Sequence, residues 1–148
     1  MSEYSKLEAQ YKDKECLLEA LAEMGYASEQ VEQHEIAAQM YDYHGHATHY
    51  VNADGDKANL IIRRQNVQNA NGGRGSATND LGFVKEGNGM YAPIVSDYDS
   101  HKHGSKWMVD LKVKYQVAVN KKEAKRQRFV QKSSKIEGRK LVIRYLQP

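Results

Sequence analysis

Residues 107–119, "WMVDLKVKYQVAV", decide the fold class because they fit two kinds of secondary structure. Every odd-numbered position is hydrophobic, which is the alternation of a half-buried strand. Met108, Leu111, Tyr115 and Ala118 also recur at the spacing of one helix face. The sequence continues into "NKKEAKRQR", in which every residue except Asn is a good helix former. The continuation favours a helix, which we predict at about 106–127.

A second, shorter helix is predicted near the N-terminus. Asp13 is a residue type whose side chain caps helix starts, and Gly25 is placed where a left-handed residue ends a helix. Between them, the apolar residues of 17–24 recur at i, i+1, i+4 and i+7, as on one helix face. We therefore predict a helix at about 13–24. Cys16 lies in its first turn and is expected to be a small buried thiol.

The remaining hydrophobic runs are separated by turn residues and predict strands. They are 2–11, 26–50 (with a short helix around 33–41 as the alternative), 58–64 after an Asp54-Gly55 type I′ turn, a hairpin of 81–85 with 90–95, and a closing hairpin of 129–133 with 141–146 through Glu137-Gly138. Pro93 indicates that its strand is an edge or has an exposed part. Residues 65–80 contain four Asn and three Gly and are predicted to be a flexible loop.

This order of elements describes an α+β fold, a mainly antiparallel sheet with two principal helices at about 13–24 and 106–127. A chain of 148 residues fits one domain, 1–148. One cysteine excludes an internal disulfide framework and a cysteine-based zinc site within the chain. The charged N-terminus does not resemble a signal peptide, and no apolar run has the length of a membrane span. We therefore expect a cytoplasmic protein that does not associate with membranes.

The net charge of +3 conceals a strong asymmetry along the chain. Residues 1–105 contain 9 Lys and Arg against 16 Asp and Glu, whereas residues 106–148 contain 13 against 3. A division of this size predicts something about partners or self-association rather than about the fold.

Four stretches, in order along nearly the whole chain, are similar to a small protein family of unknown function. They are 12–26, with Lys12-Asp13 and Met24-Gly25-Tyr26; 57–63, "KANLIIR"; 81–97, with "LGFV", "GNGMY" and Asp97; and Leu111 to Tyr115 followed by 138–145, "GRKLVIRY". The family occurs in cyanobacteria, in plastid genomes as hypothetical reading frame thirty-five, and in some phages.

The resemblance implies the fold and the placement of the helices more than an activity. Cellular members tend to be encoded near an AAA-type ATPase, so it also implies a subunit or adaptor role beside such an enzyme. The family's loop before the position of Lys57 is usually shorter and arginine-rich. The histidines and the 65–80 loop are therefore expected to be particular to this chain.

Histidines are the only candidate metal ligands. His44, His46 and His49 fall within "HGHATHY", and His101 and His103 within "HKH". Residues two apart in a strand share a face, and imidazole binds Zn, Cu or Ni. Since no HExxH or other fixed motif is present, we favour a solvated polar loop and predict no cofactor. A zinc site, with or without hydrolase chemistry, is the alternative.

The basic final third is the strongest functional signal. Its lysines and arginines are predicted to lie on a helix and a hairpin that pack together and attract anions or phosphates. The candidate binding residues are Lys114, Lys121, Lys122, Lys125, Arg126, Arg128, Arg139 and Lys140. The interleaved aromatics, such as Trp107 and Tyr115, lie at periodic positions that indicate core rather than a stacking surface.

No catalytic residue is predicted, because no serine, cysteine or lysine lies in a recognisable nucleophile motif. The favoured interpretation is a non-enzymatic binding or assembly module. It would associate with a protein partner, or with itself, through a basic C-terminal face and an acidic N-terminal part. A nucleic-acid-binding protein that uses the basic helix and hairpin is the alternative.

Overall fold

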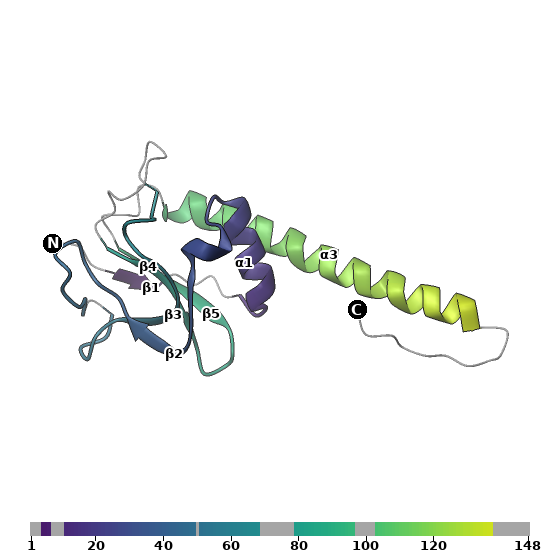
Figure 1. Ribbon diagram of the computed structural model, residues 1–148, viewed down its shortest axis with the longest axis horizontal. Coiled ribbons are helices and arrows are strands. Elements are labelled where there is room, and N and C mark those ends of the chain that lie inside the picture. Colours follow the sequence, from purple (N-terminus) through teal and green to yellow (C-terminus); the bar gives the residue numbers. More distant parts are fainter. Residues whose placement is uncertain (1–3, 7–10, 50, 69–78, 97–102, 138–148) are drawn as a thin grey trace.

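One antiparallel sheet and two long helices make up the protein, for which a computed structural model describes residues 4–6, 11–49, 51–68, 79–96 and 103–137. The elements are β1 (Tyr4–Lys6), α1 (Lys14–Glu23), a 3₁₀ turn η1 (Ser28–Gln30), β2 (Glu32–Gln39), β3 (Lys57–Ile62), β4 (Leu81–Lys85), β5 (Tyr91–Ser96) and α3 (Ser105–Glu137). The strand order is β1-β5-β4-β3-β2, with antiparallel neighbours throughout. Figure 1 shows α1 and the start of α3 together, and the rest of α3 running away from the sheet. The predicted α+β class is confirmed.

Helix α1 begins and ends where the sequence predicts. The Asp13 side chain accepts a hydrogen bond from the Cys16 amide at 3.1 Å, which satisfies one of the unpaired donors of the first turn. Gly25, with a φ of 102°, ends the helix in the left-handed region, where a side chain would be strained. Leu17 and Leu21 are completely buried. The predicted helix at about 13–24 is therefore confirmed.

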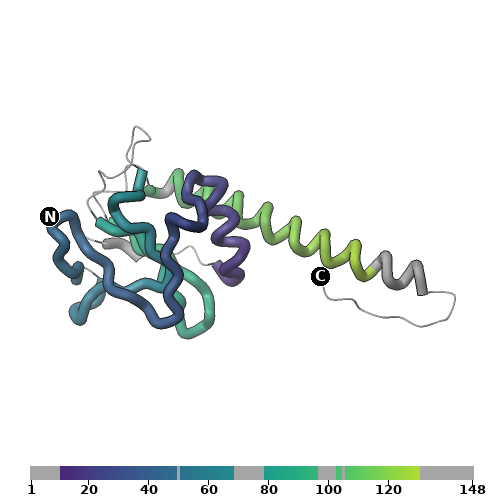
Figure 2. Tube along the Cα trace, in the orientation of Figure 1, coloured from purple at the N-terminus to yellow at the C-terminus, as the bar shows by residue number. Residues whose placement is uncertain are grey.

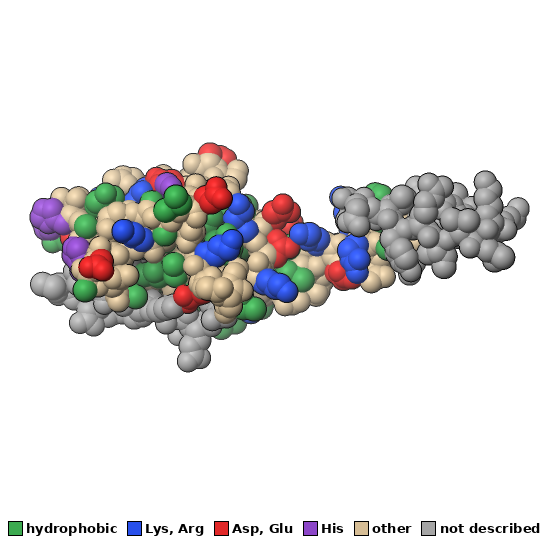
Figure 3. All heavy atoms as spheres, turned by 90° about the horizontal axis from the view of Figure 1, so that it is seen from below, with side chains coloured by type: hydrophobic (Ala, Val, Ile, Leu, Met, Phe, Trp, Pro, Cys, Tyr) green, Lys and Arg blue, Asp and Glu red, His purple; other side chains and the backbone are tan. Residues whose placement is uncertain are grey.

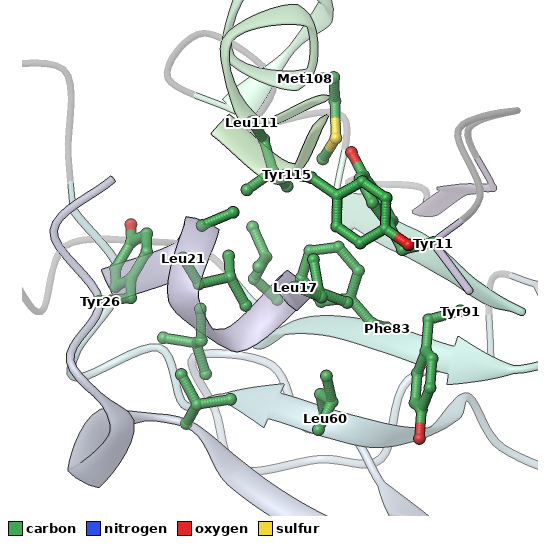
Figure 4. Packing of buried hydrophobic residues seen from close by; sticks show 14 of the residues in the cluster. Tyr11, Leu17, Leu21, Tyr26, Leu60, Phe83, Tyr91, Met108, Leu111 and Tyr115 are labelled. Atoms are coloured by element: carbon green, nitrogen blue, oxygen red, sulfur yellow. The ribbon is translucent and has the colours of Figure 1, made fainter. Parts of the chain in front are cut away.

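The main core lies between the sheet and the two helices. Figure 4 shows Leu17 and Leu21 of α1 and Leu111 and Tyr115 of α3 pointing toward Phe83 of β4. The residues of this cluster come from α1, β3, β4, β5 and α3 and from segments next to these elements. Burying a large apolar side chain contributes roughly 1.5–3 kcal/mol, so this layer is the main source of stability.

A smaller core covers the opposite face of the sheet. It contains Met40, Ala58, Ile61 and Ile94. A Cβ on Gly82 would come within 2.8 Å of the Met40 sulfur and of the Ala58 Cβ, so only glycine fits there. The strand β3 consequently has both faces buried, which explains its nearly continuous apolar sequence.

Helix α3 is longer than predicted, and this corrects the closing hairpin. Residues 129–133 lie inside the helix, not in a strand. No Gly or Pro occurs between Ser105 and Glu137, so nothing in the backbone chemistry interrupts the helix. A short segment such as 129–133 forms a strand only where a neighbouring strand is present to pair with it. The second predicted strand, 141–146, lies outside the described residues.

The hairpin of β4 and β5 is confirmed, with its turn at Gly87-Asn88-Gly89. Gly89 has a φ of 81°, and its amide bonds to the Glu86 carbonyl at 2.9 Å. The edge position that Pro93 suggested is wrong for β5, because β5 pairs with β4 on one side and with β1 on the other. On that side of β5, residues 94–96 pair with β1 and Tyr91 pairs with Tyr11. Pro93 lies between these two paired regions.

The extended structure favoured over a short helix between residues 26 and 50 is confirmed as β2, the outer strand beside β3. The β2–β3 register shifts between Gln33 and Ala38, so the chain bulges there. Asn59 closes the bulge by donating to the carbonyls of His34 and Glu35 at 3.1 and 3.2 Å. Before β3, the turn lies one residue earlier than predicted, since the Gly55 amide bonds to the Asn52 carbonyl.

Both described ends of the predicted 65–80 loop are packed against the body. Val67, Asn79 and Asp80 are almost completely buried. Residues 69–78 lie outside the described part of the chain. The segment therefore starts and finishes at fixed positions in the fold.

A charged network joins the ends of three segments beside this loop. The Asp80 carboxylate, 3% exposed, binds the Arg63 guanidinium at 2.8 Å and accepts from the Tyr41 and Arg64 amides at 2.9 and 2.8 Å. The Arg63 guanidinium also forms two 2.9 Å bonds to the Glu32 carboxylate. These bonds lower the pKa of Glu32 below its usual value. The network fixes the loop end against β2 and β3.

We predict that Asp80→Ala lowers the free energy of unfolding by about 3 kcal/mol, because it removes one of the two carboxylates bound to Arg63 and leaves the Tyr41 and Arg64 amides without their acceptor. Chemical denaturation measures the change. Asp54→Ala removes an exposed carboxylate and is the control, with an expected change within about 0.5 kcal/mol. Equal effects of the two substitutions would contradict the role given to Asp80.

Candidate functional site

Helix α3 has two halves with different surroundings. In residues 107–119, Trp107, Met108, Leu111, Tyr115 and Ala118 are buried against the body. In residues 120–137, which we call the arm, every residue from 120 to 129 is exposed. At about 1.5 Å per residue the arm is about 27 Å long. Figure 2 shows it extending away from the sheet and α1.

Two contacts, one from the first half of α3 and one from the start of the arm, hold this helix to the start of α1. The Tyr115 hydroxyl accepts hydrogen bonds from the amides of Lys12 and Asp13 at 3.0 and 2.9 Å. Asp13, whose other carboxylate oxygen caps α1, receives a 2.8 Å bond from the Lys122 ammonium. Lys122 also lies 3.8 Å from Glu15. The hydrogen bond from Lys122 lowers the pKa of Asp13.

The candidate basic residues divide into paired and unpaired groups. Lys122 is paired with Asp13, and Arg126 is paired with Glu123 one turn earlier at 3.2 Å. Within the described part of the chain, no carboxylate forms an ion pair with the members of a second group, which we call the basic face. The basic face consists of Lys114, Lys121, Lys125 and Arg128. Arg139 and Lys140 lie outside the described residues.

The basic face follows one side of α3. Its members are separated by seven, four and three residues, which keeps them on a single side of a helix. Figure 3 shows Lys and Arg side chains along the described part of the arm, with acidic side chains both among them and nearer the body. The predicted gathering of cations on this helix is therefore present, although Lys122 and Arg126 are neutralised within the chain.

A groove of about 450 Å³ lies between α1 and α3. Glu15 and Glu19 line one side, and Lys121 and Lys125 line the other. Cys16 lies at its floor and is 2% exposed, and burial raises the pKa of its thiol. A thiol with a raised pKa is a poor nucleophile, so the groove offers opposite charges rather than a reactive group.

The loop histidines lie at the other end of the body, as Figure 3 shows. The rings of His44 and His46 are 5.9 Å apart, and the Asp42 carboxylate accepts from both of their amides at 2.9 and 3.0 Å. The His49 ring contacts the Ala53 carbonyl at 3.1 Å. No group of three or more His, Cys, Asp or Glu side chains among the described residues is arranged to hold a metal ion.

His103 belongs to the core and is not brought to this loop. It is completely buried, its Nε2 lies 2.6 Å from the Tyr26 hydroxyl, and its ring meets that of Trp107 at 4.7 Å. This contact fixes the start of α3 against the segment after α1. His101 lies outside the described residues.

The Arg63 network is the feature of the site region that sequence analysis missed. It borders a cavity of about 480 Å³ lined by Tyr41, Tyr43 and His44. The Arg63 guanidinium lies 5.6 Å from the Tyr41 ring centre. Glu32 and Asp80 neutralise Arg63, and the cavity is also lined by Arg64 and Asp42, so it combines charges of both signs. The sequence signal that could have indicated this network is Arg63, a charged residue directly after the apolar strand β3.

Comparison with protein-family models, with curated proteins and with solved structures gives no match. The family resemblance therefore stays a prediction. In the described part of the chain, no helix combines the length and apolar character that crossing a bilayer requires.

The Asp13–Lys122 pair predicts a specific dependence of stability on pH. Because folding lowers the pKa of Asp13, the pair contributes stability above about pH 4, the unfolded value, and loses it as pH falls through the folded value. Asp13→Asn keeps a good helix cap but removes the charge. The free energy of unfolding of the wild type should therefore exceed that of Asp13→Asn at neutral pH and converge on it in acid.

Denaturation of both proteins between neutral pH and about pH 2 measures this difference. Glu23→Gln is the control, because Glu23 is exposed and forms no ion pair with another described residue. A wild-type advantage over Asp13→Asn that does not change with pH would show that the charge is irrelevant.

Proposed function

We propose that the protein is a non-enzymatic assembly module that binds an acidic protein surface through the basic face of α3. The most direct support is that cations of the basic face are exposed and form no ion pair with a carboxylate of the described residues. Lys121, Lys125 and Arg128 lie on an exposed arm, and no carboxylate of the described residues pairs with them.

The energetics of the arm support a negatively charged partner. Lys121 and Lys125 are four residues apart, and Lys125 and Arg128 three, so their like charges repel along the helix. Short helices in water are marginal without packing, and the exposed part of the arm buries almost nothing. An acidic surface would remove the repulsion and stabilise the helix at the same time.

A protein partner fits the arm better than nucleic acid does. Stable binding of unpaired bases uses a series of exposed aromatic rings, whereas Trp107 and Tyr115 of α3 are buried and Phe129, 37% exposed, is the one exposed ring among the described aromatic residues of this helix. Phosphates would still be attracted by the same cations, so nucleic acid is the second candidate. The acidic surface would belong to another protein, such as the AAA-type ATPase that the family resemblance implies, or to the Glu15 and Glu19 region of a second copy.

The test is a titration with two fluorescent probes, a glutamate-rich peptide and a random-sequence oligonucleotide. The variant Lys121→Gln/Lys125→Gln/Arg128→Gln should bind the peptide at least about tenfold more weakly, and salt should weaken wild-type binding. The matched control, Lys14→Gln/Lys57→Gln/Lys85→Gln, removes the same charge from exposed residues outside α3. It should change the affinity by less than about twofold.

Equal loss in both variants would mean that only the net charge matters, and would refute the proposal. Binding of the oligonucleotide but not of the peptide would replace it with the second candidate. Absence of binding to either probe would also refute it.

A further inference from the structure

A different face of α3, opposite the body, lacks charge. Val113, Val117, Asn120, Ala124 and Gln127 are all exposed, and we call this set the seam. Successive members are four, three, four and three residues apart, which is the heptad spacing of helices that pack in coiled coils. The next two positions in the same spacing, Gln131 and Ser134, are also uncharged.

The absence of charge on the seam is unusual for this helix. Every other side of the arm carries lysine, arginine or glutamate, and the arm is otherwise dominated by charged residues. Val113 and Val117 are 56% and 41% exposed, and Val109, one turn earlier, is 61% exposed. The heptad position before Val113 is Asp110, so the uncharged seam begins at Val113. Exposed branched apolar side chains such as Val113 and Val117, one turn apart, are typical of a surface that packs against another helix.

We infer that the seam pairs α3 with the α3 of a second copy, parallel and in register. The flanking charges support this occupant. In a parallel pair, the residues before every second seam position, Gln116 and Glu123, meet the residue five further along the other helix. This places Glu123 against Arg128 of the second copy, twice by symmetry. In an antiparallel pair, Lys121 and Arg128 would instead face the lysines and arginines of the other arm.

The polar members of the seam also match their own copies. Asn and Gln amides are donors and acceptors at once, so each can bond to the same residue across a two-fold axis. The Asn120 side-chain oxygen accepts a hydrogen bond from the Gln116 side-chain amide at 3.1 Å. The Asn120 amide hydrogens can donate to the same residue of the second copy. A polar residue within such a seam fixes register at some cost in affinity.

The geometry of the molecule permits the pairing. The seam lies opposite Leu111 and Tyr115, which face the core, so the two bodies would be held on the outer sides of the paired helices. The two-fold axis would place the two basic faces on opposite sides of the pair. The inference does not rest on the proposed function, because it concerns another face of α3.

The net positive charge of the arms gives the pairing a distinctive signature. Like charges on the two helices repel, and salt screens the repulsion, so the dimer should become tighter as salt is added. Binding of the basic face to an acidic surface has the opposite dependence. Sedimentation of the full chain across protein and salt concentrations therefore separates the two proposals.

Substitutions test the contact directly. Val117→Arg places a charge on the seam at an already exposed position and should weaken the dimer by at least about tenfold. Lys121→Gln/Lys125→Gln should not weaken the dimer, because neither residue takes part in the contact between Glu123 and Arg128 of the two copies. In a Cys16→Ala background, Ala124→Cys should form an intermolecular disulfide rapidly, since in-register seam positions bring the two Cβ atoms within reach.

Arg126→Cys, on the far side of the helix, is the matched control and should oxidise much more slowly. A chain that stays monomeric at all concentrations would overturn the inference, even if it binds an acidic probe. An Ala124→Cys variant that oxidises no faster than Arg126→Cys would overturn it as well. Association that weakens with salt would assign self-association to the basic face and the acidic residues of α1, not to the seam.

Discussion

The burial of one stripe of α3 against α1 and the sheet is the interaction on which the rest of the structure depends. Leu111 and Tyr115 complete the core, and the Tyr115 hydroxyl holds the amides that precede α1. The stripe ends near Val119, but the helix does not, because helix-forming residues continue without a break. Because the helix continues beyond its last buried residues, it extends past the body, and this extension is the arm.

Much of the fold could be predicted because its signals are local. Asp13 and Gly25 cap α1 through their own chemistry, and the Gly-Asn-Gly turn sets the β4–β5 hairpin within a few residues. The closing hairpin failed for the opposite reason. Whether residues 129–133 form a strand depends on a neighbour to pair with, and helix propensity prevailed where none was available. The edge position of β5 failed similarly, since β1 is distant in sequence.

The sequence shows which residues of the candidate site are basic, but it does not show which of them form ion pairs. The sequence places cations at 121, 122, 125, 126 and 128, yet only the fold brings Asp13 to Lys122. His103 looked equivalent to its histidine neighbours, but it is a core residue bonded to Tyr26. The Arg63 network was missed because Glu32 and Asp80 are far from Arg63 in the chain. In each case a contact between distant segments decided the role of a residue.

The division of α3 has a consequence for how the chain tolerates change. Almost all of the described core lies before residue 120, so the body and the projecting helix obey separate constraints. A protease that trimmed the end of the helix would leave the core intact. Substitutions in the arm are limited by the partner that the helix contacts rather than by packing in the core. The binding specificity of the arm can therefore change in evolution while the fold of the body stays the same.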